Sequence, residues 1–321
     1  MRDAPPIEIR GLVKRYGEIV AVDDVDLTVN PGDVFGYLGP NGAGKTTSLR
    51  MMLGLIRPTA GSVRLFGRDP QVSVQALAGV SGFVEAPTFY PYLSGRRNLE
   101  LYAALDGGDS AGRIEEVLDT VQLTERSKDK VKGYSHGMKQ RLGIASALLR
   151  NPRLLLLDEP ATGLDPAGMR DMRELIRDLG TRGITVLLSS HLMPEVEELC
   201  NRVAIIRRGR VAYEGSLSDL RDRAGISYRL RTTDDARARR VSEAQPGIEE
   251  VGEGRPDGLV FKATDEKAVA ALSLALAESG AHVLELTPRG ATLEDLFFEL
   301  TEDGVRSDHA PTVPRETGAP V

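Results

Sequence analysis

The most constraining feature of this 321-residue chain is the segment GPNGAGKTT at residues 39–47, which follows the apolar run VFGYL. Its spacing, Gly-x4-Gly-Lys-Thr, is the pattern of a loop that binds nucleotide phosphates. Residues 34–38 are short and apolar enough for a buried parallel strand, and apolar residues recur at helical spacing from Leu49 to Ile56. The sequence therefore places strand, glycine loop and helix in the order that a phosphate-binding loop requires.

Each residue type in this loop has a physical reason. Glycine lacks a Cβ atom, so the backbone can turn several N–H groups toward phosphate oxygens at a helix N-terminus. Lys45 supplies a cation for the β- and γ-phosphates, and the hydroxyl of Thr46 can ligate Mg²⁺. A structural turn would explain the glycines but not the Lys-Thr-Thr after them. The residues that we predict to bind ATP here are Gly39, Pro40, Asn41, Gly42, Ala43, Gly44, Lys45, Thr46 and Thr47.

Composition narrows the class of protein. The length favours two domains, and contents of 41% apolar and 27% charged residues are ordinary for a globular protein. No apolar run reaches 18 residues, so we expect no membrane span. The N-terminal segment lacks a hydrophobic signal core and the single Cys200 allows no internal disulfide, which favours the cytoplasm. A net charge of −6 without a basic stripe argues against a nucleic-acid partner.

The order of apolar segments predicts an α/β fold. Strands alternate with helices over residues 1–224, except for a helical insert at about 87–132, and this alternation is typical of a largely parallel sheet. Residues 225–301 read strand, helix, strand, strand, helix, strand, helix, which predicts a small α+β C-terminal domain. The tail at 302–321 is polar and contains proline, and we expect it to be disordered.

A second motif, LLLLDEP, ends a hydrophobic strand in two carboxylates. The carboxylate of Asp158 can reach Mg²⁺, and Glu159 beside it can polarise an attacking water. An apolar strand that ends in Asp-Glu is common by itself. Downstream of a phosphate-binding loop, it predicts a site that hydrolyses a nucleoside triphosphate.

The stretch GYSHGMKQRLGIASALLRNP, at residues 133–152, precedes this strand. Together with the other motifs it resembles the nucleotide-binding subunit of ATP-binding cassette (ABC) transporters, over about residues 7–220. The segments FYPYLSGRRNL and YSHGMKQRL are most similar to exporter ATPases of the drug- and bacteriocin-resistance group. The resemblance implies a P-loop NTPase core, ATP and Mg²⁺ as cofactors, and a membrane permease encoded as a separate chain.

The resemblance also assigns roles to single residues. Ser135 and Gly137 match signature positions that donate hydrogen bonds to a γ-phosphate bound on the opposite subunit. His136 and Met138 stand where the family usually has Gly and Gln, but donation by the Gly137 backbone survives these changes. Tyr16 matches the aromatic residue that stacks on adenine.

Three more positions match the family pattern. Asp165 matches the loop that links the two sites across a dimer, and His191 matches the switch histidine that contacts the γ-phosphate. Glu85 stands where the family usually has Gln, a ligand near Mg²⁺ and the attacking water. We expect Glu85 to act with Glu159 and His191 in catalysis, or else to turn toward solvent or pair with an arginine.

These implications predict an ATPase subunit that dimerises head to tail around two MgATP molecules. It would drive a separate permease at the cytoplasmic face of the membrane, for export of a drug, antibiotic or peptide, and would dock through its helical insert. One alternative is a non-transport ABC ATPase acting on a ribosome or DNA complex, which the single cassette and the gap of about 90 residues between loop and signature disfavour. Another is a regulatory ATP-binding module without turnover, which the presence of Lys45, Asp158, Glu159 and His191 disfavours.

Overall fold

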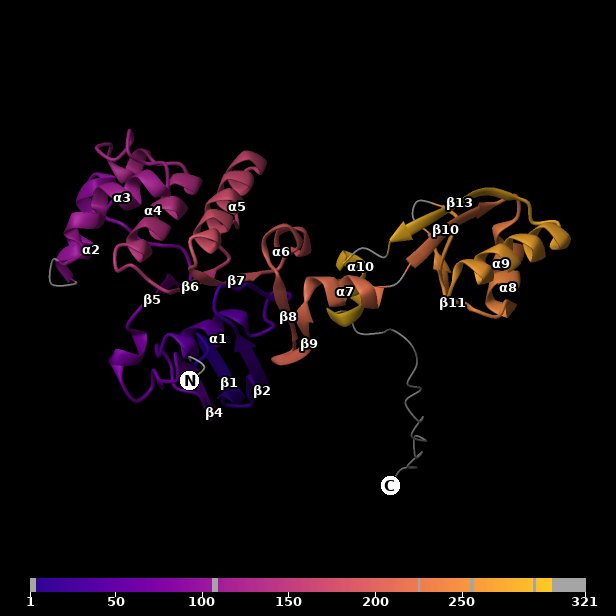
Figure 1. The fold of residues 1–321 in the computed structure, drawn as a ribbon, viewed down its shortest axis with the longest axis horizontal. Helices are drawn as coiled ribbons and strands as arrows, with labels where there is room; N and C mark the ends of the chain where they lie inside the picture. Colours follow the sequence, from indigo (N-terminus) through magenta and orange to yellow (C-terminus); the bar gives the residue numbers. More distant parts are fainter. Residues whose placement is uncertain (1–3, 106–108, 225, 255–256, 291–292, 302–321) are drawn as a thin grey trace, which may run out of the picture.

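The computed structural model describes residues 4–105, 109–224, 226–254, 257–290 and 293–301, and the tail that we expect to be disordered lies outside them. Figure 1 shows an elongated molecule, with the phosphate-loop part at one end and a smaller sheet at the other. Helices α7 and α10 lie between these two parts.

Two sheets form the larger part. A three-stranded antiparallel sheet has the order β2-β1-β4, and a six-stranded sheet has the order β5-β6-β7-β3-β8-β9. In the six-stranded sheet only the β8–β9 pair is antiparallel, so the prediction of a largely parallel sheet is confirmed. The strands are β1 (Ile7–Tyr16), β2 (Ile19–Val29), β3 (Val34–Leu38), β4 (Ala60–Leu65), β5 (Val80–Phe83), β6 (Leu154–Asp158), β7 (Thr185–Ser190), β8 (Arg202–Arg207) and β9 (Arg210–Ser216).

The helices of this part follow the expected insert and crossovers. They are α1 (Lys45–Met52), α2 (Gly95–Leu105), α3 (Ile114–Thr120), α4 (His136–Leu148), α5 (Pro166–Thr181), α6 (Met193–Leu199) and α7 (Leu217–Ala224), with short 3-10 turns at Val74–Leu77, Ala111–Arg113 and Val131–Gly133. Helices α2, α3 and α4 contact one another and stand apart from the β1-β2-β4 sheet (Figure 1). No helix in the described ranges has both the length and the apolarity that a bilayer crossing needs.

Two apolar cores lie on opposite faces of the six-stranded sheet. Along β6, Leu155 and Leu157 belong to one core and Leu154 and Leu156 to the other, as the period of two in a strand requires. All five residues of β6 are buried, because parallel strands inside a sheet are covered on both faces. The strand ends that carry the predicted catalytic residues are therefore held rigidly.

The smaller sheet is antiparallel, with the order β11-β12-β10-β13. Its elements are β10 (Ile226–Thr232), α8 (Asp235–Ala244), β11 (Ile248–Glu253), β12 (Leu259–Ala263), α9 (Glu266–Ser279) and β13 (Val283–Gly290), in the order that the sequence predicts. Tyr228 and Phe261 stack in its core, with Leu272 of α9 buried in the same cluster. Both helices therefore cover one face of this sheet.

Helix α10 (Leu293–Thr301) lies against the larger part, chiefly on α6, α7, β8 and β9. Leu293, Leu296 and Phe297 are at least nine-tenths buried and share a core with Leu217 and Leu220 of α7. The helix that we expect in the C-terminal domain thus packs on the larger part instead. The chain leaves this core after α7 and returns to it at α10.

Candidate nucleotide-binding site

The predicted phosphate loop joins β3 to α1 and is closely packed. Gly42 and Gly44 have φ angles of 80° and 102°, in the left-handed region that favours glycine. A Cβ atom on Gly44 would lie 2.3 Å from the carbonyl oxygen of Ala21 in β2. Conformation and space therefore both require glycine at position 44, immediately before the first residue of α1.

Lys45 folds back over this loop. Its Nζ atom donates a 2.7 Å hydrogen bond to the Gly39 carbonyl and lies 3.4 Å from Glu159 Oε1. The side chain is buried, so its ammonium group needs such partners. Phosphate oxygens that enter the loop would compete with Glu159 for this cation.

The carboxyl ends of β6 and β7 hold oxygen atoms beside the loop. Thr46 Oγ1 donates to Asp158 Oδ2 over 2.9 Å, and the Ser189 hydroxyl donates to Asp158 Oδ1. No group of three or more His, Cys, Asp or Glu side chains in the described part of the chain could hold a metal ion. Thr46 and Asp158 nevertheless fit Mg²⁺, since this ion commonly takes one or two protein oxygens and fills its shell with phosphate and water.

Glu159 is the centre of the site. Its Oε2 atom accepts a 2.9 Å hydrogen bond from Thr162 Oγ1 and lies 3.1 Å from His191 Nδ1. Burial acts to raise the pKa of Glu159, but the Thr162 hydrogen bond and the charges of Lys45 and His191 outweigh it and hold the pKa below its usual range. Glu159 also has φ of 47°, and such strain at a non-glycine residue is typical of functional sites.

Glu85 shares a cavity of about 230 Å³ with these residues. The lining residues are Thr46, Glu85, Ala86, His136, Gln140, Asp158, Glu159 and Thr162. The carboxylate of Glu85 forms an ion pair with Arg50 of α1 and its side chain is 67% exposed, so its contact with a metal or water would require this pair to open. The catalytic and metal roles of Glu85 therefore stay predictions.

The signature residues line a different cavity, of about 510 Å³. Ser135 caps α4 by accepting a hydrogen bond from the Met138 N–H, and Asp165 caps α5 by accepting one from the Gly168 N–H. Ser135, Gly137 and Asp165 all line this cavity, and His136 lines both cavities. Within one chain, Ser135 and Gly137 therefore line a different cavity from Thr46 and Asp158, and His136 lies between the two cavities.

Tyr16 ends β1, the residue is 47% exposed, and Lys14 Nζ lies 5.0 Å from the ring centroid. An exposed aromatic face suits a stacking role, which stays a prediction. Ser189 and Thr162, which hold Asp158 and Glu159, were not predicted. For Ser189, its place near the end of the apolar strand β7 was the available signal.

Comparison with known proteins adds independent findings. The family model for ABC transporters matches residues 22–162. The bacitracin transport ATP-binding protein BcrA of Bacillus licheniformis is 39% identical over 300 residues, which are 93% of this chain and 98% of the relative. The daunorubicin resistance ATP-binding protein DrrA3 of Streptomyces coeruleorubidus is 35% identical over 314 residues, 95% of this chain and 98% of the relative.

Solved structures resemble the larger part of the chain. An ATP-binding subunit of an ABC transporter superposes with a TM-score of 0.60 at 29% identity, over 68% of this chain and 92% of that one. A dimeric ATP-binding cassette bound to ADP and phosphate, in a post-hydrolysis state, gives a TM-score of 0.58 at 25% identity, over 66% of this chain and 98% of that one.

Proposed function

Because the chain belongs to the ABC transporter family of ATP-binding proteins, we propose that it powers an exporter whose permease is a separate membrane protein. Cassettes of this family are ATPases that power transport, and this chain is one of them. Relatives named for bacitracin transport and daunorubicin resistance support a drug, antibiotic or peptide as the exported compound. These relatives also disfavour the alternative function, a non-transport ATPase that acts on a ribosome or DNA complex.

The convergence of Lys45, Asp158, Glu159 and His191 at one edge of the sheet carries the proposed mechanism. When phosphates occupy the loop, the ammonium group of Lys45 binds phosphate oxygens in place of the Glu159 carboxylate. The carboxylate is then released from its ion pair with Lys45. Glu159, held ionised by its neighbours, accepts a proton from the attacking water. His191 orients Glu159 from the other side, and a Mg²⁺ ion held by Thr46 and Asp158 would neutralise phosphate charge.

The placement of Ser135 and Gly137 outside the cavity of Thr46 and Asp158 supports a head-to-tail dimer. The signature cavity of one chain carries Ser135 and Gly137, but Lys45 and Thr46 do not line it. A second copy could bring its phosphate loop to this cavity, so that each of two MgATP molecules touches both chains. The dimeric cassette with ADP and phosphate supports dimerisation.

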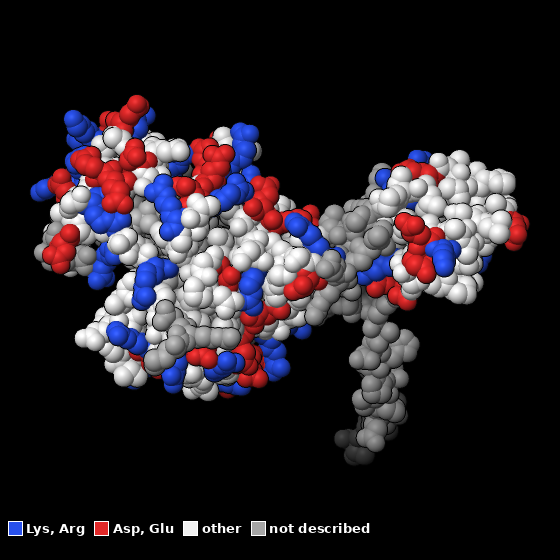
Figure 2. Space-filling view, in the orientation of Figure 1, with Lys and Arg blue, Asp and Glu red and all other residues white. Residues whose placement is uncertain are grey.

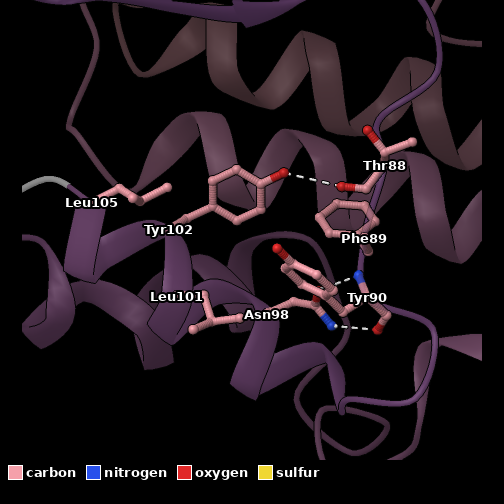
Figure 3. A pocket seen from close by; sticks show the side chains of 7 residues that line it. All are labelled: Thr88, Phe89, Tyr90, Asn98, Leu101, Tyr102 and Leu105. Atoms are coloured by element: carbon pink, nitrogen blue, oxygen red, sulfur yellow. Dashed lines mark hydrogen bonds between the residues drawn. The ribbon is translucent and has the colours of Figure 1, made fainter.

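A surface pocket of about 360 Å³ in the helical insert suits a permease contact (Figure 3). Most of its walls are aromatic or aliphatic: the lining residues are Thr88, Phe89, Tyr90, Asn98, Leu101, Tyr102 and Leu105. The Tyr102 hydroxyl donates to the Thr88 carbonyl, and Asn98 holds the Tyr90 backbone through two hydrogen bonds, so the walls are held in place. The pocket begins three residues after Glu85, which would connect an apolar permease segment seated there to the ATP site. Docking at this pocket would put the subunit at the cytoplasmic face of the membrane.

Replacing Leu105 by glutamate tests this surface. Leu105 is 86% exposed, so the charge should leave the fold and the basal ATPase activity unchanged while it disrupts an apolar contact. We expect the permease to be lost from affinity purification of the tagged variant. Leu274→Glu, at an exposed leucine of α9, is the matched control and should retain the permease. Equal retention by both variants would move the docking surface elsewhere.

A further inference from the structure

The turn that carries His191 is tied to two other elements through Ser190. The Ser190 carbonyl accepts a hydrogen bond from Gly39 N–H, at the start of the phosphate loop, over 3.2 Å. Its hydroxyl accepts from Leu192 N–H over 3.0 Å and donates to Glu195 Oε2 over 2.8 Å. One small residue thus joins the phosphate loop, the turn at His191 and helix α6.

Glu195 is an unusual residue for the place it occupies. It lies on α6, it is 6% exposed, and its Oε1 atom has no hydrogen-bond partner in the part of the chain that the structure describes. Burying a carboxyl group with an unmatched oxygen destabilises a fold, so stability alone does not explain this residue. The side chain does provide an acceptor that orients the Ser190 hydroxyl.

Helix α6 is itself held firmly, which makes Glu195 a fixed point. A Cβ atom on Gly36 of β3 would lie 2.6 Å from Val196 Cγ1, so α6 packs closely on the central strand. On another side α10 packs against α6, with Phe297 and Val196 in the same core. A side chain on this helix can therefore keep a neighbouring turn in place.

We propose that Glu195 is a positioning residue for ATP hydrolysis: through the Ser190 hydroxyl it fixes the turn that holds His191 Nδ1 3.1 Å from Glu159. This inference rests on the proposed role of His191 in turnover. Glu195 touches neither nucleotide nor Glu159 in this scheme. Its loss should therefore lower kcat and leave nucleotide affinity nearly unchanged, because Lys45 and the phosphate loop are not altered.

The test measures kcat by single-turnover hydrolysis and the affinity for a non-hydrolysable MgATP analogue in the full chain. We expect Glu195→Ala to lower kcat about 10-fold or more, since a small misplacement of a catalytic group can cost a factor near 100. Glu195→Gln keeps an oxygen that can accept from Ser190 and should restore kcat to within about threefold of the parent. Glu197→Ala, on the exposed side of α6, is the matched control and should stay within about twofold.

Combination with His191→Ala separates positioning from general damage. In that background Glu195→Ala should add less than about twofold, because the group it positions is gone. An equal further loss would overturn the inference, and so would parental kcat in Glu195→Ala. If His191→Ala keeps the parental kcat, both the proposed role of His191 and this inference are overturned. If His191→Ala loses kcat but Glu195→Ala keeps the parental value, only this inference is overturned. If Glu195→Ala does not fold, Ser190→Ala removes the same hydrogen bond together with the one from Leu192 N–H, and it must lower kcat about 10-fold or more.

Discussion

Replacing Glu159 by glutamine should tighten nucleotide binding while it stops hydrolysis. Glu159 Oε1 lies 3.4 Å from Lys45 Nζ, so the carboxylate competes with the phosphates for this cation. Glutamine has nearly the same shape and can still accept the Thr162 hydrogen bond, but it carries no charge and cannot take a proton from water. The substitution therefore removes the competitor and the base together.

The distance sets the scale of the gain in affinity. Two unit charges 3.4 Å apart interact by about 5 kcal/mol at an effective dielectric constant near 20. Glu159 is about one-quarter exposed, so solvent screens part of this attraction, and hydrogen bonds to charged groups typically contribute about 1.5–3 kcal/mol. Taking about 1.5–2 kcal/mol, we expect the variant to bind nucleotide about 10- to 30-fold more tightly.

Titration calorimetry with Mg²⁺ and a non-hydrolysable ATP analogue measures this change, and phosphate release measures turnover. Glu100→Gln is the matched control, because it also removes one negative charge but its ion-pair partner is Arg97 of α2 rather than Lys45. We expect its affinity to change less than about threefold. Equal affinity in Glu159→Gln and the parent, or equal tightening in both variants, would refute the competition between Glu159 and the phosphates.

Single substitutions test the roles of Lys45 in the phosphate loop, of the buried Glu195 and of Phe297 in the packing of α10. Lys45→Ala should abolish ATP hydrolysis, and turnover within twofold of the parent would contradict the assignment of the loop. Burial raises the pKa of Glu195, so the stability that its protonated form contributes is present at acid pH and is lost as the pH rises through the raised value. Glu195→Gln should therefore gain thermal stability relative to the parent as the pH rises above about 4.5, the ordinary value, and a pH-independent Tm difference argues against it. Phe297→Ala should cost about 3 kcal/mol of unfolding free energy, whereas the exposed Phe298→Ala should cost less than about 1 kcal/mol, and equal Tm shifts would contradict the packing of α10.

The phosphate loop and its flanking elements could be predicted because their signals are local. A five-residue apolar run between turns has few uses other than a buried strand, and β3 and β6 begin and end where their sequences change from apolar to polar. Glycines at positions 42 and 44 are needed for their own φ angles, which depend on nearby backbone. The same holds for Asp158 and Glu159, since the end of a strand fixes where the next side chains stand.

Contacts between distant segments could not be predicted in this way. The sequence shows that Glu85 is a carboxylate in place of an amide, but not that Arg50, 35 residues earlier, lies beside it. Likewise, Ser190 and Glu195 are close in sequence, yet their hydrogen bond matters only because the Ser190 carbonyl also meets Gly39. Each of these contacts forms only when the sheet has brought the two segments together.

The surface against which helix α10 packs was the hardest feature to predict from the sequence. The stripe of Leu293, Leu296 and Phe297 on this helix requires an apolar cover but does not say which. The nearby β10–β13 sheet has one face covered by α8 and α9, and on its other face Arg229 and Arg231 form ion pairs with Asp257. Packing an apolar helix there would take these charges out of water, at a cost of several kcal/mol for each ion. Leu217 and Leu220 of α7 offer an apolar surface without that cost, so α10 packs against the cassette. The choice between the two surfaces depends on ion pairs that form only in the folded sheet, and the sequence alone does not show these pairs.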